Sequence, residues 1–468
     1  MELRKLLALG ASRALPPVLI FTLALTVTLD IYLAKPLAYG IDGPYYIVQY
    51  YSIRDSGLIK YPDPPLAFYA LFPFQHLSYV LSGDPALGLK VGVSLFTSLT
   101  AALMYVALRR IYPKDYVAPV AIPLIYALSP FTLRLETDFI KNSLAMVFIP
   151  LLLTALTVRS ARLRALLIVT SVAGAALTHV LTYGVLVLLI AGILLHNVVT
   201  SSVLSRLDAT LLALTPVAVT ATIFAAPSIV GYDTCKLASL IKALTPSGAT
   251  PPRPPHAPPP THPGAVVASL PGSTYLALTY TLSVIGLVAS TVLRRGLVPA
   301  LSATSSVLNA VLNTPITPWQ WLMRFSLMSS ILLPLSLTWV LKVRRPYVKL
   351  LVLAVVAVVA IHGLIHTAPR LGPSIGVGEY LEVKGLRSII PEGSRVAVPN
   401  AKLRYWVEAL NYGVYELLAE PPGPGGPTYV IVEAFRHPHP APPHSMLVHR
   451  GRYLEVFLVG WLRGTAYP

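Results

Sequence analysis

Three acidic side chains and a lysine stand in two short polar segments that follow hydrophobic runs. Asp42 lies in YGIDGPYYIVQYY, and Glu136, Asp138 and Lys141 lie in RLETDFIKN. Two carboxylates two residues apart point to one side of an extended chain, where they can hold a divalent cation such as Mg²⁺ or Mn²⁺. A neighbouring lysine can meet a phosphate. The structural alternative is that Asp42 beside Gly-Pro belongs to a turn, and that the other acids complement a helix dipole.

The composition places these residues in an integral membrane protein. Of 468 residues, 55% are hydrophobic and 12% are charged, and the mean hydropathy is +0.67. Apolar runs that approach the length of a bilayer crossing indicate about eleven transmembrane helices. The expected spans are 15–34, 88–108, 117–133, 139–157, 165–178, 180–199, 210–227, 273–293, 297–312, 321–341 and 349–366. A single cysteine, Cys235, excludes an internal disulfide framework.

The charged residues predict the orientation of this bundle. A net charge of +17 does not indicate a nucleic-acid partner, because the basic residues lie in loops and do not gather in one patch. With a cytoplasmic N-terminus, the inner segments hold sixteen basic and three acidic residues, whereas the outer segments up to residue 366 hold ten and eight. The positive-inside rule therefore predicts a cytoplasmic N-terminus and places Asp42 on the outer side of the cell membrane.

The sequence divides into a membrane domain, residues 1–366, and a smaller extracytoplasmic domain, residues 367–468. The membrane domain has an outer loop at 35–87, with helices lying at the interface, and a proline-rich outer loop at 228–272. The tail contains β-rich runs at 395–399, 428–435 and 454–462 around a helical run at 401–410. The predicted fold is thus an all-α polytopic membrane bundle followed by a small α/β domain.

The order of these segments resembles that of the GT-C superfamily of membrane glycosyltransferases. The run IDGPYYIVQYYSIRDSGLIKYPDPPLAFYALF is similar to the first outer loop of that family, and LETDFIKN is similar to its acidic second-loop motif. The run TPWQWLMRFSLMSSILLPLSL resembles the segment whose arginine approaches the lipid phosphate, and this likeness selects Arg324. The resemblance covers residues 15–340. Two departures are that Gly43 follows Asp42, where a second acid is common, and that the WWDYG motif of oligosaccharyltransferases is absent, which leaves the O-mannosyltransferase-like and lipid-modifying subgroups.

The resemblance implies an enzyme that moves a sugar from a polyprenyl-phosphate donor to an acceptor protein, glycan or lipid on the extracytoplasmic face. In this interpretation Asp42 is the general base. Arg324 and Lys141 stabilise the departing phosphate. Glu136 and Asp138 bind a divalent cation or the sugar hydroxyls.

Further residues are expected to shape the pocket. Tyr45, Tyr46 and Trp319 either stack on sugar faces or belong to the aromatic belt at the membrane interface. His179 falls between the fifth and sixth spans at the outer level, where it either lines the pocket or ends a helix and hydrogen-bonds a backbone carbonyl.

The main alternative is a polytopic transporter or lipid flippase that performs no covalent chemistry. Such carriers place ionisable residues near the bilayer midplane, and the expected spans contain almost none there. The sequence also has no GxxxxGK motif of the kind that binds nucleotides in a pump. A non-catalytic subunit with a related fold is a third possibility.

Overall fold

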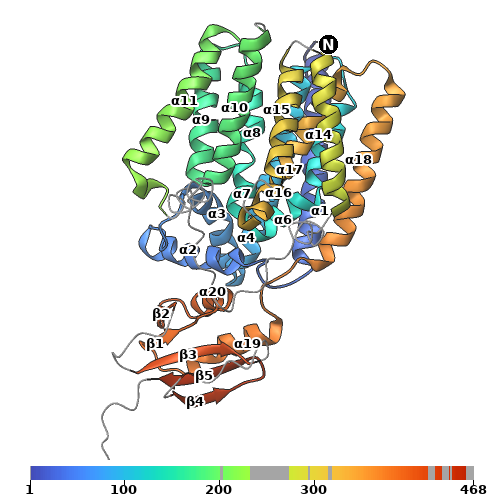
Figure 1. Ribbon diagram of the computed structural model, residues 1–468. Coiled ribbons are helices and arrows are strands. Elements are labelled where there is room, and N and C mark those ends of the chain that lie inside the picture. The colour runs from blue at the N-terminus through green and yellow to red at the C-terminus, as the bar shows by residue number, and fades with distance from the viewer. Residues whose placement is uncertain are drawn as a thin grey trace, which may run out of the picture. The chain divides into compact units, whose positions relative to one another are not determined.

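The computed structural model describes residues 2–200, 204–231, 273–293, 296–314, 319–419, 427–434, 442 and 445–459 (Figure 1). The chain forms two compact units. Unit 1 comprises Met1–Ala34, Tyr61–Leu71 and Lys90–Leu371, and unit 2 comprises Lys35–Lys60, Phe72–Leu89 and Gly372–Pro468. Cys235 and most of the proline-rich loop expected at 228–272 lie outside the described residues.

In the part that the structure describes, the secondary structure of unit 1 consists of helices joined by loops. Its longer helices are α1 (Glu2–Leu33), α4 (Pro85–Ile111), α9 (Ala161–Thr178), α10 (Val180–Thr200), α11 (Arg206–Ala225), α14 (Ser273–Leu293), α15 (Leu297–Leu312) and α18 (Pro346–Thr367). Its shorter helices are α5 (Ala118–Ala127), α6 (Pro130–Asp138), α7 (Ile140–Ala145), α8 (Phe148–Ala155), α16 (Trp319–Leu327) and α17 (Ser329–Ser336). Helix α3 (Leu66–Ser82) and helix α4 contribute residues to both units.

Every span expected from the sequence coincides with a helix or with a run of short helices. Among the described residues, six helices are long and apolar enough to cross a membrane, or seven if α5 and α6 form one bent span, and four further apolar helices are shorter. The protein is a multi-pass membrane protein. The count of about eleven crossings and the side on which each terminus lies remain predictions.

The broken spans have local causes. Helices α5 and α6 meet at an angle of 44°. Pro130 begins α6 and cannot donate a backbone hydrogen bond, and the Ser129 hydroxyl caps α6 by accepting from the Phe131 amide at 3.2 Å. Phe139, with φ −139° and ψ 56°, separates α6 from α7. The backbone is therefore irregular before the acidic motif and again within it, at Phe139.

Small residues let the helices of unit 1 approach closely. A side chain on Gly192 of α10 would overlap Thr304 of α15, and one on Gly174 of α9 would overlap the ring of Phe148. Ser302 of α15 donates a hydrogen bond to the Ser336 carbonyl at 2.7 Å. Close approach of small residues and hydrogen bonds between helices are how membrane bundles gain packing energy without a hydrophobic drive.

Unit 2 combines helices with one mixed sheet. The helices are α2 (Asp42–Ser56), the later part of α3, α19 (Val377–Gly385) and α20 (Ala401–Leu410). The strands are β1 (Arg395–Ala397), β2 (Glu416–Leu418), β3 (Thr428–Glu433), β4 (Ser445–Arg450) and β5 (Leu454–Val459). They lie in the order β2-β1-β3-β5-β4, with β1 parallel to β2 and β3, and β5 antiparallel to β3 and β4 (Figure 1). The small sheet expected in the tail is confirmed.

Most of the expected outer loop belongs to the same unit as the tail. The Gly40 amide donates to the Gly372 carbonyl at 2.9 Å. A side chain on Gly88, at the start of α4, would overlap the backbone of Phe74 in α3. The ring of Tyr45 in α2 lies 5.2 Å from that of Tyr405 in α20. Residues separated by more than 300 positions therefore form one packed body.

Candidate functional site

A buried ion pair marks the segment between α6 and α7. We call Asp138–Asn142 the α6–α7 junction. The Lys141 ammonium lies 2.5 Å from Asp63 Oδ2, and the side chains are only 8% and 7% exposed. Asp63 comes from the PDPP segment before α3, and sequence reasoning did not select it. The two prolines that follow Asp63 restrict the chain there, which is the one local signal that its position is fixed.

The two acids of the motif do not converge. Glu136 and Asp138 lie in α6, where residues two positions apart are separated by about 200° around the axis, so the extended geometry expected from the sequence is wrong. Asp138 Oδ2 lies 2.5 Å from Arg134 Nε, one turn earlier. Glu136 is fully buried, near Thr97 of α4 and Tyr126 of α5.

This arrangement does not fit a divalent cation shared by Glu136 and Asp138. Their carboxylates leave the helix in different directions, and one of them already has a guanidinium partner. No group of three or more His, Cys, Asp or Glu side chains with metal-binding geometry occurs within the described ranges. The expected Mg²⁺ or Mn²⁺ site at these two residues therefore finds no support in their geometry.

Arg324 reaches the same junction from another helix. It lies in the last turn of α16, and its guanidinium carbon is 5.5 Å from the centre of the Phe139 ring. An arginine beside an aromatic ring keeps its planar hydrogen-bonding groups in a defined orientation. Two cationic side chains, Arg324 and Lys141, thus lie at one junction. Trp319 begins α16, but its side chain lies outside the described residues.

His179 lies at the break between α9 and α10 and is 6% exposed. Its Nδ1 accepts a hydrogen bond from the Leu181 amide at 3.1 Å, which satisfies a donor in the first turn of α10. One residue later, Thr182 donates to Asn142 Oδ1 at 3.3 Å. His179 thus lies at a helix end, as one of the two interpretations expects, but the backbone group that bonds to its Nδ1 is an amide and not a carbonyl. Its segment is tied to the α6–α7 junction.

Asp42 is the first residue of α2 in unit 2 and is half-buried. The turn expected beside Gly-Pro is wrong, because Asp42, Gly43 and Pro44 begin α2, where an acid complements the helix dipole. The carboxylate also lies within electrostatic range of α20. Burial raises the pKa of the Tyr405 phenol, Arg404 opposes this, and the negative charges of Asp42 and Glu408 add to it.

Tyr45 and Tyr46 pack inside unit 2. Their exposed fractions are 9% and 1%, and their rings meet edge to face at 5.9 Å. The Tyr45 hydroxyl accepts a hydrogen bond from Gln49 Nε2 at 3.0 Å. Rings buried to this degree do not present open faces, so stacking of these two tyrosines on a sugar is not supported.

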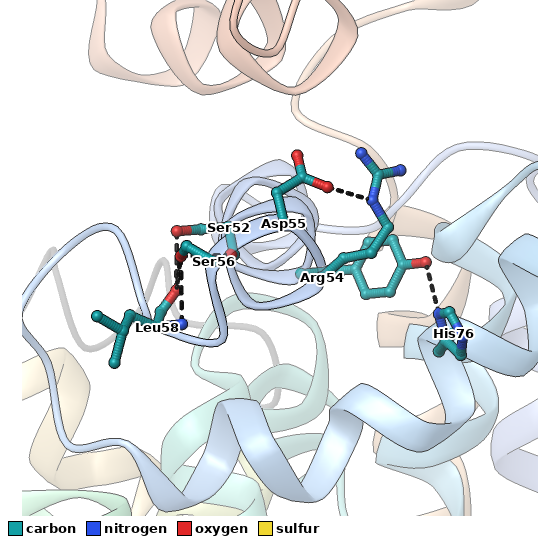
Figure 2. Close-up of polar contacts among 7 residues, drawn as sticks. Ser52, Arg54, Asp55, Ser56, Leu58 and His76 are labelled. Carbon is teal, nitrogen blue, oxygen red and sulfur yellow. Dashed lines mark hydrogen bonds and ion pairs between the residues drawn. The ribbon is translucent and has the colours of Figure 1, made fainter.

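The far end of α2 is held by a set of polar contacts (Figure 2). The Ser52 hydroxyl donates to the Leu58 carbonyl at 2.8 Å, and Arg54 Nε lies 2.6 Å from Asp55 Oδ1. The Tyr50 hydroxyl lies 3.3 Å from His76 Nδ1 and thereby joins α2 to α3. Of these contacts, the one between Tyr50 and His76 holds α2 against another helix of unit 2.

The fold of this chain is similar to that of a solved archaeal membrane glycosyltransferase. The oligosaccharyltransferase of Archaeoglobus fulgidus, solved in complex with Zn and sulfate, aligns with a TM-score of 0.57 and 13% identity over 85% of this chain and 62% of that one. ArnT from Cupriavidus metallidurans, bound to undecaprenyl phosphate, aligns over 97% of this chain and all of that one at 13% identity, but with a TM-score of only 0.42. No protein-family model and no curated protein matches the sequence.

The alignment also limits what can be carried over. This chain spans less than two thirds of the length of the Archaeoglobus fulgidus oligosaccharyltransferase, and at 13% identity the likeness concerns the fold alone.

Proposed function

We propose that this protein transfers a sugar from a polyprenyl-phosphate donor to an acceptor on the extracytoplasmic face of the cell membrane. The observation that carries the proposal is the gathering of Lys141 and Arg324 at the α6–α7 junction of a GT-C fold. Two cations beside a membrane-spanning bundle suit an anionic lipid phosphate. The acceptor is a protein, glycan or lipid, and a hexose is the sugar class that the sequence resemblance favours.

The reaction needs one base and one stabilised leaving group. The acceptor hydroxyl attacks the anomeric carbon and gives its proton to a general base, a role that the sequence resemblance assigns to Asp42. The bond between that carbon and the phosphate oxygen breaks, and the polyprenyl phosphate leaves with the electron pair. Arg324, with its planar fork of donors, and Lys141 offset the charge that develops on the phosphate. No step uses a metal ion.

Before the donor binds, Lys141 is held by its ion pair with Asp63. With side chains 8% and 7% exposed, neither charge is well solvated, so the ion pair stabilises both charges when no phosphate is present. In the proposal the arriving phosphate shares the lysine with Asp63. Asp63 is then a positioning residue, since it holds the ammonium without touching the reacting atoms.

Donor turnover in membranes tests these assignments. We expect Arg324→Gln to lower transfer from a radiolabelled polyprenyl-phosphate sugar by about 10²–10³-fold, because removal of one preorganised donor to a developing anion costs that much in other enzymes. Asp42→Asn should also reduce transfer strongly. Arg345→Gln is the matched control, since Arg345 is exposed and lies before α18. Equal transfer by all variants and the parent would refute the site.

One observation favours the alternative, a transporter or flippase. Glu136 is fully buried in α6, and carriers use buried ionisable groups to bind ions or relay protons. Glu136 lies near the end of the bent α5–α6 pair, however, away from its middle. In the turnover experiment a flippase would leave the labelled donor chemically intact, so the two functions give different products.

A further inference from the structure

Unit 2 contains a cavity of about 120 Å³ that no part of the proposed reaction uses. Its walls come from α2, the turn before α4, α19 and α20. Three aromatic side chains, Tyr51, Tyr380 and Trp406, line it together with the carboxylate of Asp84. A cavity that pairs aromatic rings with a few polar groups is typical of a small-molecule site.

The aromatic wall is held in place by its own contacts. The rings of Tyr380 and Trp406 meet edge to face, with centres 5.8 Å apart. Trp406 Nε1 donates a hydrogen bond to the Ser374 hydroxyl at 2.9 Å. This bond satisfies the indole N–H and fixes the orientation of the ring. Tyr51 is flanked by the ring of Tyr412 at 5.4 Å. A ligand would therefore meet preformed surfaces.

The polar groups lie on the same cavity. One Asp84 oxygen accepts the Ala86 amide at 2.8 Å and so caps α4, but a carboxylate has further acceptor positions. Burial raises the pKa of Tyr380, and the charge of Asp84 adds to this, which indicates that the phenol and the carboxylate lie near each other. The cavity thus offers a strong acceptor and phenolic hydroxyls beside apolar faces.

We propose that this cavity binds one sugar ring. A pyranose has an apolar face of C–H groups and an edge of hydroxyls, and these match the half-buried rings of Tyr51 and Tyr380 and the Asp84 carboxylate respectively. Trp406 is 1% exposed and supports the Tyr380 ring from behind. A compact cation is the competing ligand class, because aromatic faces and a carboxylate also attract cations.

The α2 side chains that line the cavity leave the helix away from Asp42. Ile47 and Tyr51 follow Asp42 by five and nine residues, so they lie about 140° and 180° away from it around α2. In the proposal the ring bound here is a non-reacting one. Its assignment to a non-reacting sugar of a glycan acceptor rests on the proposed function, whereas the binding itself does not.

Direct binding to the full-length protein in detergent micelles tests the site. The probes are methyl α-mannoside, methyl N-acetyl-α-glucosaminide and tetramethylammonium chloride, each titrated with saturation-transfer NMR and without any lipid donor. We expect a glycoside to bind and Tyr380→Ala to weaken its binding about tenfold. Asp84→Asn should weaken it severalfold while retaining the helix cap, since Asn caps as well as Asp.

Two controls keep the result interpretable. Asp55→Asn removes a charge from α2 outside the cavity and should leave binding unchanged. Tyr380→Phe keeps the ring, so it should bind better than Tyr380→Ala if stacking matters, and melting curves check that each variant is folded. Failure of the parent to bind either glycoside, unchanged binding in both cavity variants, or binding of tetramethylammonium alone would overturn the proposal. Glycoside binding without sugar transfer would instead count against the proposed function only.

Discussion

Replacement of Lys141 by methionine should destabilise the protein strongly. The Lys141 and Asp63 side chains are 8% and 7% exposed, and their charged atoms are 2.5 Å apart. Lys141→Met leaves the Asp63 carboxylate buried without the lysine charge. Removal of one partner from a buried pair typically costs about 3–5 kcal/mol, because the remaining charge cannot regain its hydration. Asp63→Asn should cost a similar amount by leaving the ammonium buried.

The double variant Lys141→Met/Asp63→Asn separates this effect from general damage to the site. It contains neither charge, so it should melt at a higher temperature than either single variant, in a standard double-mutant cycle. The assay is thermal unfolding of purified protein in one detergent. Asp55→Asn is the control, because the Arg54–Asp55 pair is 29% and 47% exposed and exposed pairs contribute only about 0–1 kcal/mol. Two results would refute this reasoning. One is a melting temperature of Lys141→Met equal to that of Asp55→Asn, and the other is a stability loss in the double variant equal to the sum of the losses in the two single variants.

Three further predictions concern unit 2 and the helix packing. In the Lys60–Glu408 ion pair the lysine side chain is 43% exposed and the glutamate side chain 2% exposed. Lys60→Met leaves a buried carboxylate and should therefore lower the melting temperature more than Glu408→Gln does. A larger loss with Glu408→Gln would contradict this. Gly88→Ala should destabilise the protein by about 1–3 kcal/mol, because the new methyl group meets the backbone of the facing helix α3. Gly184→Ala adds its methyl group to open space within α10 and should stabilise the protein by about 0.5–1 kcal/mol. Equal effects of the two substitutions on unfolding would contradict the close approach of α3 and α4 at Gly88. Burial raises the pKa of Tyr51 from 10.0 to about 12, so the folded state holds this proton more tightly and its stability should fall as pH rises from about 10 through 12. Tyr51→Phe should flatten that fall in alkaline melting curves, and an unchanged profile would show that the tyrosine is not the cause.

The membrane helices can be predicted from the sequence because hydropathy alone identifies them. A segment that crosses a bilayer must satisfy its backbone internally and present apolar side chains, so the expected spans match helices along the whole described chain. The breaks on either side of α6 are harder to predict. Ser129-Pro130 is a helix-start signal that the sequence displays, and it explains why the acidic motif became a helix where an extended chain was expected.

The contacts of the site depend on residues far apart in the chain, which no local pattern encodes. Lys141 was selected from its motif, but its partner Asp63 lies 78 positions earlier. Tyr45 was expected at an open surface, yet α20 covers its ring with Tyr405. Strand β4 was missed because its central residues Met446, Leu447 and Val448 are exposed and lack alternation between buried and exposed positions. Pairing and burial of this kind follow from the folded arrangement and not from composition.

The central claim is that the protein breaks the bond between a sugar and its lipid phosphate. The most direct measurement uses purified protein in liposomes, a donor labelled separately in its sugar and in its polyprenyl phosphate, and membranes that supply native acceptors. The account predicts that labelled sugar joins the acceptor while an equal amount of labelled polyprenyl phosphate is released, and that Arg324→Gln suppresses both. Recovery of the donor with both labels still joined, whether on the same leaflet or on the opposite one, would contradict it.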